Sequence, residues 1–322
     1  MFDSLPAVPA KEGDIAPLPP PEIERALIYA EAEKATATRR AYQADAEVWS
    51  AWCRARGLES LPAAPEALAA FLASEADAGK SASTITRRLA AIGYAHKLAG
   101  LESPTNSEAV RAVLRGIRRT IGTAPKQKAP AEAAALRRMI EACPETLIGL
   151  RDRTILAIGF AGAMRRSEIA ALECGDIRDI EGGIEITIRR SKGDQEGAGQ
   201  VIAIPHGTKI QPVATLKGWL SAAGITDGPV FRSIRKGGAV QAEALSTTSI
   251  AQIVKDAAER AGLPAEQFSG HSLRAGFLTS AAKAGSNLWK MAEVSRHRRL
   301  ETLQGYVRDA ERLKDHAGGS FL

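Results

Sequence analysis

The sequence lacks the marks of a secreted or membrane-spanning protein. Its only cysteines, Cys53, Cys143 and Cys174, are isolated and form no C-x-x-C pair. This argues against a disulfide framework and a thiolate metal site, so we expect a reducing compartment and no metal. No apolar run approaches the roughly 18 residues of a spanning helix, and the N-terminus lacks the basic-then-apolar order of a secretory signal. We therefore expect a soluble cytoplasmic protein without a membrane partner.

Aromatic residues and nucleotide-binding signatures are also scarce. Aromatics make up 5% of the 322 residues, whereas hydrophobic residues make up 45%. This balance, together with abundant alanine, favours helices packed through small side chains over a β-sandwich. Neither G-x-x-x-x-G-K-[ST] nor G-x-G-x-x-G occurs, so no nucleotide-binding loop is predicted. We expect a mainly helical protein of two domains with no cofactor.

The basic residues are only slightly in excess, but they are clustered. Lysine and arginine number 43 against 37 acidic residues, which gives a net charge of +6. In the predicted helix over 107–121, one stripe is apolar (Val110, Val113, Leu114, Ile117, Ile121) and a separate stripe is arginine. Acidic residues four positions away are few, so we expect these arginines to bind a phosphate backbone; a solvated charged face is the alternative. The full predicted DNA-binding set is Arg39, Arg40, Arg87, Arg88, Arg111, Arg115, Arg118 and Arg119.

Proline and lysine divide the chain into segments. Residues 1–21 contain six of the 16 prolines, which predicts a flexible tail. Residues 22–121 form a helical domain of four or five amphipathic helices. Residues 122–131, "GTAPKQKAPA", read as an extended linker, because they are rich in Pro, Lys and small residues and show no apolar period. A second domain then covers 132–322.

Two apolar patterns predict local structure in these domains. In the first domain, helical spacing places four residues on one buried face: Tyr42, Ala46, Trp49 and Cys53. In the second, strict alternation predicts a half-buried strand through Ile184, Ile186 and Ile188, and a glycine-rich turn over 193–199 returns the chain as a β-hairpin. Most of the chain after residue 207 is predicted to be helical.

Two motifs place polar residues three positions apart on predicted helices. In "SGHSLRAGF" these are His271 and Arg274, and in "AGAMRRSEIAAL" they are Arg165 and Glu168. Side chains at this spacing are neighbours on a helix surface, so an imidazole and a guanidinium could reach one small anion together. Glu168 either orients Arg165 or simply solvates the helix.

Two further motifs add groups suited to phosphoryl transfer. "RRSKGDQ" carries Lys192 at the hairpin turn, where an ordinary exposed lysine is the alternative. "SRHRRLETLQGYVRDA" places His297 nine residues before Tyr306. A tyrosine hydroxyl has a pKa of about 10 and is a weak nucleophile, so it needs an activating base and an electrophilic target. A phosphodiester fits, because arginines can donate paired hydrogen bonds to its non-bridging oxygens.

In this order, the motifs resemble those of the tyrosine recombinase, or phage integrase, family. The resemblance implies an all-helical, SAM-like core-binding domain followed by a mixed α+β catalytic domain, which together clamp duplex DNA. It implies that Arg165, Arg274 and His297 bind the scissile phosphate, that His271 accepts a proton from the nucleophile Tyr306, and that Lys192 is the general acid. Two positions depart from the family pattern: Arg296 stands where a glycine usually precedes the histidine, and Arg166 stands where an apolar residue usually follows the first arginine.

The resemblance also implies partners and an assembly. We expect a site-specific recombinase that acts on a double-stranded DNA site through a 3′-phosphotyrosyl intermediate and a Holliday junction. Four protomers would assemble on DNA from monomers, with possible accessory DNA-bending or directionality proteins. Two alternatives stay open: type IB topoisomerase activity, and a non-catalytic DNA-binding or architectural protein on a recombinase scaffold.

Overall fold

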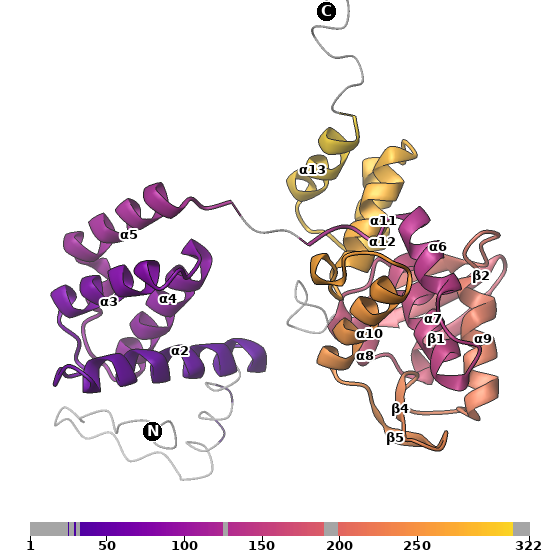
Figure 1. Cartoon of the computed structure of the whole chain (residues 1–322), viewed down its shortest axis with the longest axis horizontal. Coiled ribbons are helices and arrows are strands. Elements are labelled where there is room, and N and C mark those ends of the chain that lie inside the picture. The colour runs from indigo at the N-terminus through magenta and orange to yellow at the C-terminus, as the bar shows by residue number, and fades with distance from the viewer. Residues whose placement is uncertain (1–24, 26–28, 30–32, 125–127, 190–198, 312–322) are drawn as a thin grey trace, which may run out of the picture. The chain divides into compact units, whose positions relative to one another are not determined.

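The computed structural model describes residues 25, 29, 33–124, 128–189 and 199–311. The chain divides into two compact units, Met1–Lys126 and Gln127–Leu322 (Figure 1). The flexible tail predicted for residues 1–21 lies outside the described residues. In the described part of the chain, no helix is long and apolar enough to cross a membrane.

The first unit is built from helices. Those described are α2 (Thr36–Arg54), α3 (Pro65–Asp77), α4 (Ala82–Leu98) and α5 (Glu108–Ile121), with a short 3-10 turn at Pro104–Asn106. Serine hydroxyls begin two of them: Ser81 accepts from the Thr84 N–H at the start of α4, and Ser107 accepts from the Val110 N–H at the start of α5. Helix α2 packs on α4, and α3 packs on α5. The predicted helical first domain is confirmed.

The core of this unit follows the predicted apolar faces, with one exception. The Trp49 ring packs edge-on against Phe71, with 5.1 Å between centroids, and Cys53 is fully buried beside them. Val110 and Ile117 of α5 are buried in the same cluster. The prediction that Ile121 belongs to this stripe is wrong, because its side chain is 42% exposed. It is the last residue of α5, after which Gly122 turns the chain away with a φ of 76°.

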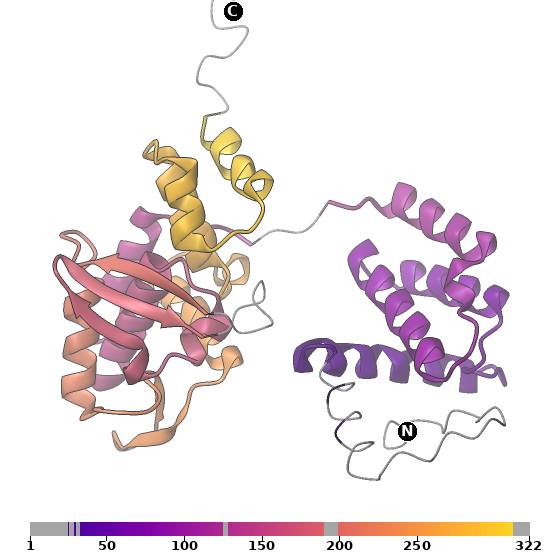
Figure 2. The ribbon, with the colours of Figure 1, turned by 180° about the vertical axis from the view of Figure 1, so that it is seen from behind.

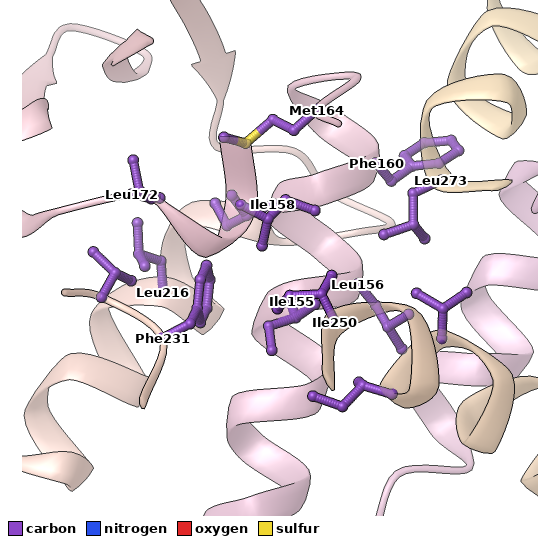
Figure 3. Close-up of a cluster of buried hydrophobic side chains, with 14 of the residues drawn as sticks. Ile155, Leu156, Ile158, Phe160, Met164, Leu172, Leu216, Phe231, Ile250 and Leu273 are labelled. Atoms are coloured by element: carbon purple, nitrogen blue, oxygen red, sulfur yellow. The ribbon is translucent and has the colours of Figure 1, made fainter. Parts of the chain in front are cut away.

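The second unit surrounds the apolar helix α7. Ile155, Leu156 and Ile158 of α7 are buried against side chains of other elements, among them Ile250 and Leu273 (Figure 3). In chain order the elements are α6 (Ala133–Glu141), α7 (Leu147–Ala161), α8 (Arg166–Ala170), β1 (Ile177–Ile180), β2 (Gly183–Ile188), β3 (Gln200–Pro205), α9 (Pro212–Ala223), β4 (Arg232–Ile234), β5 (Val240–Ala244), α10 (Thr247–Arg260), α11 (Ser272–Lys283), α12 (Leu288–Ser295) and α13 (Leu300–Ala310). This mainly helical unit with small sheets confirms the predicted fold class (Figure 2).

The predicted hairpin forms strands β2 and β3 of a three-stranded antiparallel sheet in the order β1-β2-β3. Ile184 pairs with Ile204 and Ile186 with Ile202, and all four side chains are buried on one face. The turn residues 190–198 lie outside the described part. Most of the described chain after residue 207 is helical, as predicted, but strand β1 and the two-stranded sheet of β4 and β5 were not predicted. Strands of three to five residues are too short to show a clear alternation of apolar residues.

The segment that enters the second unit fixes the start of helix α11. The Ala129 N–H donates to the Gln267 carbonyl (2.7 Å) and the Ala131 N–H to the Ser272 carbonyl (2.9 Å). Gly276 of α11 permits this approach, since a Cβ there would lie 1.9 Å from the Ala131 carbonyl oxygen. The end of the predicted linker is thus packed against the helix that carries Arg274.

Candidate active site

Arg165 begins helix α8 and is held by the carboxylate three residues later. Glu168 accepts hydrogen bonds from the Arg165 backbone N–H (2.8 Å) and from its Nη1 (2.6 Å). The Glu168 side chain is fully buried, whereas that of Arg165 is 21% exposed. This burial excludes the solvated-helix interpretation of Glu168, whose carboxylate bonds to both the backbone and the guanidinium of Arg165. Burial alone would raise the pKa of Glu168, but Arg296 and Arg165 outweigh it and hold that pKa below its usual value.

Arg274 reaches the tight turn between α7 and α8 from the first turn of α11. Its side chain is buried, and its Nη1 donates to the carbonyl oxygen of Ala163 at 2.8 Å. Ala163 adopts a φ of 44°, a left-handed conformation that an alanine rarely takes and that its neighbours must offset. Burial, followed by the nearby cations Arg165 and Arg296, lowers the pKa of Arg274 to about 9. The Arg274 guanidinium therefore stays positively charged at neutral pH, and the negative charge near it does not balance the positive charges of the arginines.

His297 follows helix α12 directly and faces the same guanidinium. Its Nδ1 lies 2.8 Å from the Ser295 hydroxyl, and that hydroxyl donates its own proton to the Met291 carbonyl. The serine oxygen is therefore left to accept from Nδ1–H, which leaves Nε2 as the acceptor of the ring. Arg274 Nη2 lies beside both ring nitrogens, 3.3 Å from Nδ1 and 3.5 Å from Nε2. Burial and the charges of Arg274 and Arg165 lower the pKa of His297 to about 4. The imidazole is thus neutral at physiological pH.

Tyr306 lies on α13, half-buried beside the apolar cluster of Leu278, Met291 and Leu303. Burial raises the pKa of its hydroxyl, and the positive charge of Arg274 partly opposes this shift. The phenol is therefore protonated at neutral pH and requires a base to become a nucleophile. Helices α11 and α13 pack on each other, which brings the tyrosine and the arginine together.

His271 is exposed at the start of α11, and its charge acts on His297. The adjacent Gly270 leaves room for Arg166. A Cβ added at Gly270 would lie only 2.9 Å from the Cβ of Arg166. Arg166 itself is exposed. The structure thus brings together five of the six predicted catalytic residues. Lys192, the sixth, lies outside the described residues.

Comparison with protein-family models identifies both units. The phage integrase family matches residues 131–312, and its N-terminal SAM-like domain matches residues 25–102. The chain belongs to the phage integrase family.

Individual relatives agree with this assignment. An integrase/recombinase xerD homolog of Selenomonas ruminantium is 38% identical over 293 residues, which span 89% of this chain and 86% of that protein. Recombinase cre of Escherichia phage P1 is 27% identical over 287 residues, which span 82% of this chain and 81% of that protein. The fold resembles that of a lambda integrase tetramer bound to a Holliday junction, with a TM-score of 0.61, 18% identity and coverage of 89% of this chain and 76% of that one. The chain is therefore a tyrosine recombinase, an enzyme that cuts and rejoins DNA.

The basic residues of the recombinase's first unit fall into two groups. Those on α2 and α5 are exposed: Arg39, Arg40, Arg111, Arg115, Arg118 and Arg119. Arg87 and Arg88 of α4 instead face buried carboxylates, because Arg87 Nε bonds to Asp45 at 2.7 Å and Arg88 pairs with Glu75 and Asp45. The Arg88 side chain is only 12% exposed.

The expectation that acidic partners are scarce was therefore incomplete. Asp45 and Glu75 lie on other helices, so a search at i±4 along α4 could not find them. On α5 itself, Arg115 pairs with Glu108 seven residues earlier. Arg88 thus has a clear role in holding helices together, whereas the arginines of α2 and α5 are exposed.

The recombinase site is a concentration of positive charge with little acidic compensation. Arg165, Arg274 and Arg296 gather around one carboxylate, Glu168, which pairs with Arg165 and with Arg296. No group of three or more His, Cys, Asp and Glu side chains in the described ranges could hold a metal ion. The arrangement is suited to bind an anion with guanidinium donors and to stabilise extra negative charge on it.

Proposed function

We propose that this recombinase breaks DNA by attack of the Tyr306 hydroxyl on a scissile phosphodiester. The tyrosine oxygen forms a bond to phosphorus, the bond to the 5′ oxygen breaks, and a 3′-phosphotyrosyl link and a free 5′ hydroxyl result. The observation that carries this proposal is the convergence of Arg165, Arg274 and His297 from three separate segments, with Tyr306 near enough for Arg274 to act on its pKa.

The phosphate would be held by Arg165 and Arg274. The partners already described tie one Nη of each guanidinium to the protein, Arg165 Nη1 to Glu168 and Arg274 Nη1 to the Ala163 carbonyl. Each therefore has a fixed orientation before DNA arrives, and the remaining donors can meet the non-bridging oxygens. Such preorganised donors stabilise the charge that develops in the transition state without having to reorganise.

Two proton transfers complete the cleavage step. His271, exposed at the start of α11, takes the proton from the Tyr306 hydroxyl. Lys192 gives a proton to the departing 5′ oxygen, a role that rests on its position in the family motif. His297 is neutral in the free protein because of its burial and the cations beside it. A bound phosphate would offset those cations and favour the protonated imidazole as a further donor.

The rejoining step runs the same chemistry in reverse with a different strand. The free 5′ hydroxyl of a partner strand attacks the phosphotyrosine, so the energy of the broken bond is kept and no nucleotide is needed. The solved lambda integrase is a tetramer bound to a Holliday junction. We propose the same assembly here: four protomers on two DNA sites in the cytoplasm, joined by a Holliday junction, with accessory proteins where the direction of exchange must be set.

A nicked duplex tests the proposal, because the small fragment released after cleavage diffuses away and traps the covalent intermediate. The protein and its Tyr306→Phe variant are incubated with nicked duplexes made from DNA that flanks its own gene, and adducts are resolved on a denaturing gel. We expect an adduct with the wild type and none with the variant, while both bind the same DNA. Salt-sensitive binding without any adduct from the wild type would contradict catalysis and favour a DNA-binding role. Relaxation of supercoiled DNA without sequence preference would indicate topoisomerase activity.

A further inference from the structure

Arg296 is buried in the middle of the site, at a position that glycine usually occupies in the family motif. Its side chain is 2% exposed. Its backbone has φ 58° and ψ 40°, a left-handed conformation that ends helix α12. Glycine takes this conformation without strain, whereas a side chain there costs roughly 1–2 kcal/mol. The conformation explains why glycine suits the position, and an arginine here requires compensating contacts.

The Arg296 guanidinium supplies these contacts by joining segments that are distant in the sequence. Its Nη1 donates to the carbonyls of Gly162 (3.0 Å) and Val294 (2.6 Å), which connects the α7–α8 turn to the end of α12. Its Nη2 donates to the Ala163 carbonyl (3.2 Å) and to Glu168 Oε2 (2.7 Å). One side chain therefore ties the residue before His297 to the turn and the helix that carry the phosphate-binding arginines.

The two acceptors of Arg296 Nη2 each also hold a residue assigned to the phosphate. Glu168 Oε2 accepts both from Arg296 and from the Arg165 backbone N–H. The Ala163 carbonyl accepts both from Arg296 and from Arg274 Nη1. Displacement of Arg296 would free the acceptors that fix Arg165 and Arg274. The Arg296 Nη atoms themselves are bonded to protein oxygens beneath the site, so they do not take part in phosphate contact.

We propose that Arg296 is a positioning residue of this recombinase, which sets the orientation of Arg165 through Glu168 and that of Arg274 through the Ala163 carbonyl. The proposal rests on the proposed function, because it assigns Arg296 an effect on the rate of Tyr306 attack. The effect is indirect. Where a glycine would leave the backbone unrestrained, Arg296 fixes it through its hydrogen bonds. His297 follows directly after this restrained residue.

Three substitutions separate positioning from simple stabilisation. Arg296→Gly keeps the backbone conformation accessible but removes the guanidinium. Arg296→Lys retains a positive charge but offers a single nitrogen, which cannot serve the acceptors of both Arg165 and Arg274. Arg151→Ala is the matched control. Arg151 is also buried in the second unit and also pairs with a carboxylate, that of Asp152, but it bonds to Asp152 and to the Arg232 carbonyl and not to the described residues of the site.

The rate of adduct formation on the nicked duplex is measured at saturating protein, together with DNA affinity and thermal stability. We expect Arg296→Gly to bind DNA within a few-fold of the wild type but to form the adduct about 10–100-fold more slowly, as is typical when a group that orients a ligand-binding residue is lost. Arg296→Lys should recover part of the rate. Arg151→Ala should lower thermal stability without slowing the folded protein. If Arg296→Gly fails to fold, the Lys variant still decides the question through its rate.

A double-mutant cycle tests the route of the effect. If Arg296 acts through Glu168, adding Arg296→Gly to Glu168→Gln should slow adduct formation less than it does in the wild type. Equal wild-type and Arg296→Gly rates would overturn the positioning role while leaving the proposed function intact. Fully additive effects in the cycle would overturn the route through Glu168. Absence of any adduct from the wild type would instead refute the proposed function itself.

Discussion

The guanidinium groups of Arg274 and Arg296 donate to one acceptor, the Ala163 carbonyl oxygen, at 2.8 and 3.2 Å. Two cations on one carbonyl are tolerable only where an anion balances them, and Glu168 contacts Arg296 alone of this pair. The site therefore holds a local excess of positive charge before DNA binds. The phosphodiester of the proposed function would supply the missing anion.

Arg274→Lys should reduce cleavage far more than binding. A lysine ammonium cannot hold the Ala163 carbonyl and the phosphate in the fixed fork geometry of a guanidinium, so transition-state stabilisation is lost. We expect adduct formation to slow by about 100–1000-fold, in the range found when one oxyanion donor is removed. Single-turnover cleavage and DNA affinity, measured on the same nicked duplex, check this. A rate within a few-fold of the wild type would show that Arg274 does not contact the phosphate.

His297 should contribute to stability in a pH-dependent way. Its pKa is about 4 in the folded protein, and about 6.5 in an unfolded chain. Between these values the unfolded state binds a proton that the folded state does not, so the free energy of unfolding falls as the pH drops from about 6.5 towards 4. Above about 6.5 this contribution is fully present.

The His297→Gln variant isolates that contribution. Urea unfolding at pH 7.5 and pH 5 should show a larger loss of stability on acidification in the wild type than in the variant. Glu168 does not affect the comparison, because its pKa is lowered in the folded protein. Its contribution to the free energy of unfolding is lost only below about pH 4.5. Identical losses in the two proteins would contradict a buried, neutral His297.

The exposed and the buried arginines of the first unit should behave differently. Arg119→Ala on α5 removes an exposed cation, and we expect the slope of log affinity against log salt to fall in magnitude by about 1. Arg88→Ala leaves Glu75 and Asp45 without that cation and should cost about 3 kcal/mol of unfolding free energy, with little change in the slope. Binding titrations at several salt concentrations, paired with unfolding curves, measure both. An unchanged slope for Arg119→Ala would show that this arginine of α5 does not contact the DNA phosphates.

Gly276 should be intolerant of any side chain. Gly276→Ala would place a methyl group 1.9 Å from the Ala131 carbonyl oxygen, so α11 must shift and Arg274 with it. We expect a loss of about 1–3 kcal/mol in stability and slower cleavage. Gly218→Ala on α9 is the control, because a Cβ there meets no atom within 4 Å. That change should be neutral or stabilising by up to about 1 kcal/mol. Equal unfolding midpoints for the two variants would refute the packing argument.

The sequence predicted those parts of the fold that depend on local periodicity. The alternation at Ile184, Ile186 and Ile188 was enough to predict β2, and helical spacing was enough to predict the buried face around Trp49. The catalytic set was predicted from the order of its motifs, because each motif is short and common when taken alone. Strands β4 and β5 escaped prediction because a few residues cannot display a period.

Contacts between distant segments were the part that the sequence could not reveal. The pairing of Arg87 with Asp45 spans 42 residues, and that of Arg296 with Glu168 spans 128. Nothing in a local window distinguishes arginines that pair with buried carboxylates from solvated ones. The one available signal was the departure at Arg296 from the family's glycine, and its meaning became clear only when the left-handed backbone and its acceptors were seen together.

The most direct test of the central claim is to identify the amino acid that becomes bound to DNA. The covalent complex formed on a nicked duplex is digested with protease and nuclease, and the nucleotide-carrying peptide is sequenced by mass spectrometry. We predict that the modified residue is Tyr306, linked to a 3′ phosphate. Attachment to any other residue, or to a 5′ phosphate, would contradict the account.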